Sequence, residues 1–125
     1  MYKILVIEDD PSGTQLLIAL IELEGFKGFG LGDWADPLAD VERRRPDLVL
    51  MDVHLSRWDG VELLRDIRAH ADPRIAKLPV LMMSAEDLES RCLSAGANGF
   101  FEKPFDLEKL IATIRELVEV DLLDN

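Results

Sequence analysis

The chain has 125 residues, 48% of them apolar, and a formal net charge of −11 at pH 7. A chain of this length can bury one hydrophobic core and leaves little for a second. The acidic excess argues against binding to nucleic acid or an anionic membrane, since both need a basic face. No apolar run approaches the length of a membrane span, and we expect no signal peptide. The single cysteine and two scattered histidines give no metal-binding pattern. We therefore expect one cytoplasmic domain.

Strands and helices alternate through the first half of the chain. Asp10 and Pro11 are typical of a helix start, and Gly25 is typical of a helix end. The second strand is interrupted by glycines, which favours an edge position. The predicted elements are, in order, a strand at 4–7, a helix at 11–24, a strand at 26–31, a helix at 35–45 and a strand at 48–51.

The second half continues the alternation. Its predicted elements are a helix opened by Asp59 and Gly60, a turn at Asp72 and Pro73, a strand at 79–83, a short helix at 86–95, a strand containing Phe100 and Phe101, and a last helix capped by Asp106. Five strands that alternate with five helices predict a parallel sheet covered by helices on both faces.

Asp52 follows the most apolar strand of the chain. Residues 48–51 form a continuous hydrophobic run, which is typical of a strand buried on both faces. Ligands and chemistry in open α/β sheets lie at the carboxyl ends of the strands. Asp is also common in turns, so Asp52 alone does not establish a site.

Four strand ends carry polar groups. Glu8 and Asp9 follow the first strand, Asp52 the third, Ser84 the fourth and Lys103 the fifth. Parallel strands end at the same edge, so these groups should meet in one shallow cleft. Two carboxylates about 5 Å apart repel by roughly 3 kcal/mol at an effective dielectric of about 20. Such a cluster favours a cation, and oxygen ligands with water positions suit Mg²⁺. A metal and a lysine could then neutralise a phosphoryl group on Asp52.

The motifs at these strand ends resemble those of the response-regulator receiver domain of two-component signalling. They are ILVIEDDP, PDLVLMDVHL, VLMMSAED and GANGFFEKPF, in order and with ordinary spacing. The resemblance covers essentially the whole chain, so residues 1–125 are expected to form one receiver domain without an output domain. It implies a flavodoxin-like α/β fold: a single doubly wound five-stranded parallel sheet, of order 2-1-3-4-5, with five helices.

The resemblance also implies a role for each site residue. These are Asp52 as phospho-acceptor, Glu8 and Asp9 as the acidic pair, the backbone carbonyl of His54 as a Mg²⁺ ligand beside Asp9 and Asp52, Ser84 as the switch hydroxyl, Phe100 as the switch aromatic, and Lys103 as the phosphate-pairing lysine. The Lys103–Pro104 bond is expected to be cis. The domain would accept and lose its own phosphoryl group and would not otherwise act as an enzyme.

The implied partners are a histidine kinase or phosphotransfer protein and an unknown downstream target or output domain. A phosphorylation-dependent homodimer is a further expectation. The face formed by the helix at 86–95, the fifth strand and the last helix is expected to change shape on phosphorylation. The chain could be a stand-alone receiver or the receiver cut from a longer regulator.

Some positions depart from the family pattern. Many members have Pro and Gly where this chain has Ser56 and Arg57, which bears on the stiffness of that loop. His54 and Glu86 flank the phosphoryl site at positions that tune how fast water removes the phosphate. Trp58 is large for a loop and is interpreted as a partner contact.

The sequence disfavours three alternative functions. A flavodoxin-like electron carrier needs a phosphate-cradling first loop, and the Glu8–Asp9–Asp10 loop would repel a phosphate. An aspartate-nucleophile phosphatase usually has a second Asp where this chain has His54. A degenerate receiver that binds partners without phosphorylation is disfavoured by the full set of site residues.

Overall fold

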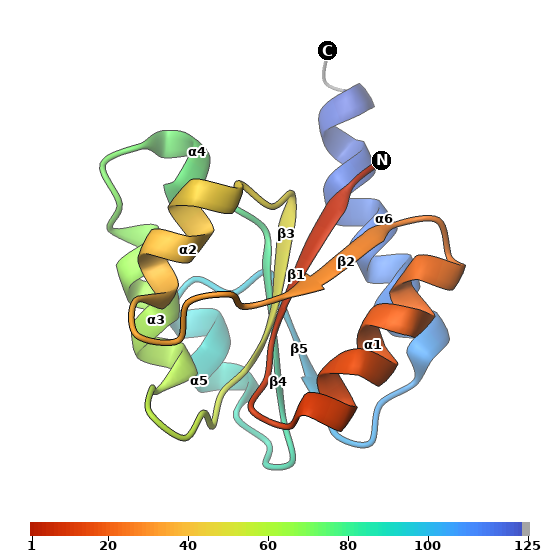
Figure 1. Cartoon of the computed structure of the whole chain (residues 1–125), viewed down its shortest axis with the longest axis horizontal. Helices are drawn as coiled ribbons and strands as arrows, with labels where there is room; N and C mark the ends of the chain where they lie inside the picture. Colours follow the sequence, from red (N-terminus) through yellow and green to blue (C-terminus); the bar gives the residue numbers. More distant parts are fainter. Residues whose placement is uncertain (124–125) are drawn as a thin grey trace.

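The computed structural model describes the backbone of residues 1–123 and the side chains through Glu119. Five parallel strands form one sheet in the order β2-β1-β3-β4-β5, which confirms the predicted order (Figure 1). The strands are β1 Lys3–Ile7, β2 Lys27–Gly30, β3 Leu48–Asp52, β4 Val80–Ser84 and β5 Gly99–Glu102. The helices are α1 Pro11–Leu23, α2 Pro37–Arg44, α3 Gly60–Arg68, α4 Pro73–Ala76, α5 Glu89–Ser94 and α6 Leu107–Leu123.

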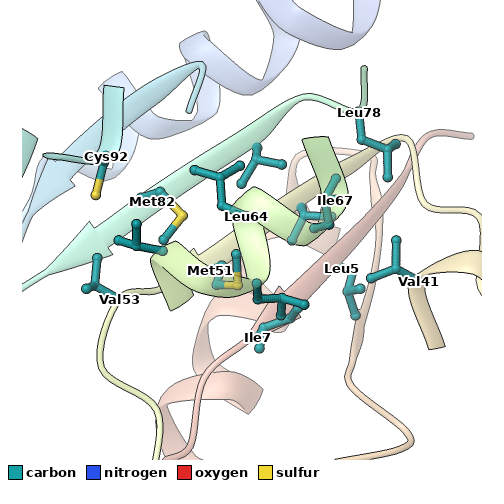
Figure 2. Close-up of a cluster of buried hydrophobic side chains, with 14 of the residues drawn as sticks. Leu5, Ile7, Val41, Met51, Val53, Leu64, Ile67, Leu78, Met82 and Cys92 are labelled. Carbon is teal, nitrogen blue, oxygen red and sulfur yellow. The ribbon is translucent and has the colours of Figure 1, made fainter. Parts of the chain in front are cut away.

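Helices cover both faces of the sheet. Helices α1 and α6 lie on one face and α2, α3 and α5 on the other (Figure 1). The two faces carry separate clusters of buried apolar side chains. Figure 2 shows the α3 side, where Leu64 and Ile67 pack against Met51 and Met82 of the central strands. No helix within residues 1–123 is both long and apolar enough to cross a membrane.

Two details of the predicted helices are wrong. The Asp72–Pro73 turn continues into the one-turn helix α4, because the Asp72 carboxylate accepts from the Arg74 N–H at 2.9 Å. The chain therefore has six helices within its described part rather than five. Helix α5 begins at Glu89 and not at Glu86. The face expected to switch is accordingly formed by α5, β5 and α6.

Asp40 fixes the loop between β2 and α2. Its buried carboxylate accepts from the Gly32 N–H at 2.8 Å and from Arg43 at 2.9 Å, and Arg44 lies 3.6 Å away. Burial alone would raise the pKa of this carboxyl, but these donors outweigh burial and lower the pKa. The edge strand β2 is thus tied to α2 by a charged side chain.

Arg68, in the last turn of α3, holds together the chain on either side of β4. Its guanidinium donates to the carbonyls of Ala76 and Leu78 at 2.9 and 2.7 Å. It also donates to the Gly96 carbonyl and to Asn98 Oδ1, both at 2.9 Å. Burial lowers the pKa of Arg68. Backbone and amide dipoles thus stabilise this charge.

Candidate functional site

The carboxyl edge of the sheet brings Asp52, Lys103 and Glu8 together, as predicted from the strand ends. The Lys103 ammonium lies 2.5 Å from Asp52 Oδ2 and 3.6 Å from Glu8 Oε1. The registers of the central strands produce this meeting, because Asp52 pairs with Met83 and Ser84 pairs with Glu102. Residues from four strand ends therefore share one small region.

Asp52 is the last residue of β3, and all five residues of that strand are buried. Its second carboxylate oxygen, Oδ1, accepts from the His54 N–H at 3.0 Å. Helix α3 approaches the end of the strand closely, since Gly60 donates to the Val53 carbonyl at 2.8 Å. A Cβ on Gly60 would lie 2.3 Å from the Asp52 carbonyl oxygen, so only glycine allows this packing.

Lys103 is positioned by its own backbone. Its N–H donates to the Ser84 carbonyl at 2.7 Å, which joins the ends of β4 and β5. The Lys103–Pro104 bond is cis, as expected. Burial would lower the pKa of Lys103, but the hydrogen bond and charge of Asp52, with Glu8, outweigh it and raise the pKa. The ammonium is therefore held in its charged form.

Glu8 is more enclosed than Asp9. Burial raises the pKa of the Glu8 carboxyl, the Lys103 charge opposes this rise, and the Asp52 charge adds to it. The Thr14 hydroxyl donates to the Glu8 carbonyl at 3.2 Å. A Cβ at position 13 would lie 2.8 Å from Glu8 Oε1, so Gly13 leaves space for the carboxylate.

Asp9 is exposed and does not contact Lys103. Its Oδ2 atom accepts from the backbone N–H of Ser56 and, at 2.6 Å, from the Ser56 hydroxyl. Sequence reasoning missed this role of Ser56, since it considered only the stiffness of the loop. The signal available was the residue type: Ser carries both an N–H and a hydroxyl, whereas Pro carries neither.

Ser84 is fully buried, and its hydroxyl oxygen accepts from the Glu86 N–H at 3.1 Å. Two residues after Ser84, Glu86 Oε1 lies 2.8 Å from His54 Nε2, and both side chains are exposed. This pair bridges the loops that follow β3 and β4. His54 and Glu86 therefore flank the site, as the sequence suggested.

Phe100 and Trp58 lie away from the cluster of charges. Phe100 is partly buried in β5 against the α3 side of the core, opposite Met82. The Trp58 indole donates to the Trp34 carbonyl at 2.9 Å, and 39% of Trp58 is exposed. Its interpretation as a partner contact remains a prediction.

The donor chemistry at this edge fits a hard divalent cation. Glu8, Asp9 and Asp52 supply three carboxylates, and the Lys103 ammonium contacts two of them, Glu8 and Asp52. Within the described part of the chain, no three His, Cys, Asp or Glu side chains are grouped closely enough to hold a metal together. Mg²⁺ commonly uses one or two carboxylates and keeps several waters. The residues thus fit a largely hydrated ion, with the His54 carbonyl as the expected backbone ligand.

Comparisons with known proteins agree with this geometry. A sequence profile described as "Response regulator receiver domain" matches residues 4–115. The chain is 35% identical over 119 residues to "Response regulator MprA" of Mycobacterium leprae, a match that covers 93% of this chain and 50% of that protein. It spans about half the length of the curated relatives it matches.

Two solved structures show the same fold. The chemotaxis response regulator CheY4 of Vibrio cholerae superimposes with a TM-score of 0.81 at 25% identity, covering 94% of this chain and 98% of that one. The receiver domain of sensor histidine kinase PA1611 from Pseudomonas aeruginosa gives a TM-score of 0.80 at 28% identity, covering 94% and 97%. That structure has a magnesium ion coordinated in its active-site cleft.

Proposed function

The chain belongs to the response regulator receiver domain family, and from this premise we propose that it is a phospho-accepting signalling switch. Asp52 receives the phosphoryl group from a histidine kinase or phosphotransfer protein. The observation that carries the proposal is the Asp52 carboxylate at the end of β3, 2.5 Å from the Lys103 ammonium. Ser84, whose hydroxyl is buried, is the last residue of the neighbouring strand β4.

In the transfer step, an Asp52 oxygen forms a bond to phosphorus while the bond from phosphorus to the donor imidazole nitrogen breaks. The imidazole keeps the electron pair of that bond. The chain supplies positioning and charge compensation, which is most of what phosphoryl transfer needs. Lys103 is poised to follow the negative charge from the carboxylate to the new phosphoryl oxygens.

Bound Mg²⁺ would supply the additional positive charge that a phosphoryl group needs beside two other carboxylates. Asp9, Asp52 and the His54 carbonyl would hold it, with Glu8 in support. Millimolar Mg²⁺ should raise the melting temperature, because it binds the folded chain alone. Asp9→Asn should weaken this rise, whereas Asp66→Asn, a change at an exposed site on α3, should not. Equal melting curves with and without Mg²⁺ would contradict the metal site.

The surface of α1 supports a helical partner beside the site. Leu16 is 61% exposed and Leu23 is 82% exposed. They lie two turns apart on the same face of the helix, with Ala19 and Leu20 between them. A partner helix that covers this stripe would bring its own side chains near the acidic loop that precedes α1. The acidic chain would meet this partner in the cytoplasm and would not itself bind nucleic acid.

Transmission is proposed to pass through Ser84 and Phe100. A phosphoryl group on Asp52 offers the Ser84 hydroxyl a charged acceptor. Drawing Ser84 inward frees space beside β4, and Phe100 has no polar atom that would oppose its turning. The α5–β5–α6 face would then shift between two states and bind the downstream partner, an output domain or a second copy of the chain.

Labelling with acetyl phosphate and Mg²⁺ tests the acceptor. Intact mass should rise by one phosphoryl group that is acid-stable and base-labile. Asp52→Asn should abolish the label and Asp66→Asn should retain it. Lys103→Ala should lose more of the switching than of the label. Label on a Ser or His, or no label on the wild type, would overturn the acceptor assignment; the second result would favour the degenerate receiver.

Hydrogen exchange with and without beryllofluoride tests the switch. Changes should concentrate between Ser84 and Lys103, and Ser84→Ala should suppress them. Changes confined to the loops at Asp9 and Asp52 would show an occupied site without transmission to the α5–β5–α6 face.

A further inference from the structure

Two donors from one residue converge on a single oxygen of Asp9. Ser56 lies in the loop between β3 and α3, 47 residues from Asp9 in sequence. Both its backbone N–H and its hydroxyl donate to Asp9 Oδ2. A carboxylate oxygen bonded in this way has hydrogen atoms directed at the lone pairs that a cation would need.

We propose that Ser56 is an internal competitor of Mg²⁺ for Asp9, so that loading of the metal requires release of the Ser56 loop. This inference rests on the proposed function, in which Asp9 is a metal ligand. Ser56 is thus a positioning residue that lowers the affinity for Mg²⁺. Without the ion, the exposed Asp9 carboxylate accepts hydrogen bonds from Ser56 instead.

The surroundings of the contact leave room for the exchange. A cavity of about 310 Å³ lies against it, lined by Asp9, Trp34, Ser56 and Arg57. Water molecules that accompany Mg²⁺ can approach Asp9 from this side, and the ion keeps several of them in protein sites. Metal binding therefore exchanges two internal donors for a hydrated cation without opening the core.

Tryptophan fluorescence should report the release of Ser56. The Leu55 N–H donates to the Trp58 carbonyl at 3.2 Å, and the Trp58 indole donates to the Trp34 carbonyl at 2.9 Å. The loop that carries Ser56 is thereby linked to both tryptophans of the chain. A displacement of Ser56 should change the environment of Trp58 and its fluorescence.

The test is a graded series of variants titrated with MgCl₂ at constant pH and ionic strength, followed by calorimetry and tryptophan fluorescence. Ser56→Ala removes the hydroxyl donor and keeps the N–H, while Ser56→Pro removes both. Ser94→Ala, at an exposed position on α5, is the control. The Kd for Mg²⁺ should fall about 5-fold in Ser56→Ala and about 10-fold or more in Ser56→Pro, since a typical hydrogen bond contributes about 1 kcal/mol net and about 1.4 kcal/mol is tenfold in Kd.

The fluorescence change on Mg²⁺ binding should shrink in Ser56→Ala and shrink further in Ser56→Pro, because one donor holds the loop to Asp9 in the first variant and none does in the second. An unchanged Kd in Ser56→Ala would overturn the proposed competition between Ser56 and Mg²⁺ for Asp9. Ser56→Ala alone is sufficient for this test if Ser56→Pro disturbs the loop in other ways. A weaker affinity would overturn it as well, since Ser56 would then orient Asp9 for the metal. In both of these results Mg²⁺ still binds, so the proposed function stands; absence of binding in all proteins would overturn the metal site together with this inference.

Discussion

Replacing Gly60 by Ala should destabilise the chain more than its small change in volume suggests. An ideal Cβ at this position would lie 2.3 Å from the Asp52 carbonyl oxygen and 3.0 Å from Val53 Cα. Favourable separations between heavy atoms are about 3.5–4.0 Å, so β3 and α3 must separate by roughly 1 Å. Both obstructing atoms belong to the backbone where β3 ends, and neither can rotate away.

The expected loss follows from two opposing effects. Overpacking costs about 1–3 kcal/mol and occasionally more, and the upper end applies where backbone must move. Gly60 does not have a positive φ, so the alanine gains up to about 1 kcal/mol of helix propensity. We expect the free energy of unfolding to fall by about 2–3 kcal/mol. Phosphoryl uptake should slow as well, because the displaced carbonyl belongs to Asp52.

Urea unfolding followed by circular dichroism measures this loss. With a slope of about 1–3 kcal/mol/M, the midpoint should fall by about 1–2 M. Gly25→Ala is the matched control: its φ is +94°, and within the described part of the chain no atom beyond its two neighbouring residues lies within 4 Å of its Cβ position. Its cost is backbone strain alone, about 1–2 kcal/mol. A smaller loss in Gly60→Ala than in Gly25→Ala would refute the close-approach argument.

Asp40 and Arg68 allow two further tests of buried charge. Asp40→Asn should lower the free energy of unfolding at pH 7 by about 2 kcal/mol. The pKa of the folded carboxyl lies below the ordinary 3.8, so its stabilisation is complete above that pH and is lost as the pH falls through the folded-state pKa. Urea midpoints of wild type and variant should therefore converge below pH 3.8, and a gap independent of pH would contradict the assignment. Arg68→Met should lower the free energy of unfolding by about 2–3 kcal/mol, because the oxygens that accept from Arg68 are left unpaired. Arg68→Lys should recover less than half of this loss. Arg65→Met should cost under about 0.5 kcal/mol, because it removes one exposed ion pair, and equal losses at positions 65 and 68 would contradict the proposed role of Arg68.

The sheet and most of the site could be predicted because their signals are local. Apolar runs end abruptly at Asp52 and Ser84, and parallel geometry then brings the strand ends to one edge. The proximity of Asp52 and Lys103 follows from that geometry. The acidic loop at Glu8 could be placed at the same edge because it comes directly after the first strand.

Other features depend on contacts that periodicity does not encode. The start of α5 was predicted too early, because Glu86 bonds to the Ser84 hydroxyl and Glu89 N–H bonds to Asp87, 3.4 Å away, before the helix begins. The Ser56–Asp9 contact joins two loops, and a loop conformation is fixed by its particular hydrogen bonds. Sequence reasoning identified Ser56 as unusual but not what it contacts.

The hydrogen bond from Lys103 N–H to the Ser84 carbonyl restricts how the chain can vary in length. Phe100 packs on the α3 side of the sheet and Phe101 on the α1 side, so side chains alternate up to the lysine. Deleting one residue within β5 would exchange the two phenylalanines and turn Lys103 away from Asp52. Insertions between Ser84 and the start of α5 would leave that alternation intact. Variants of this sequence can therefore carry insertions in the loop between Ser84 and α5, while the number of residues from Gly99 to Lys103 must stay the same.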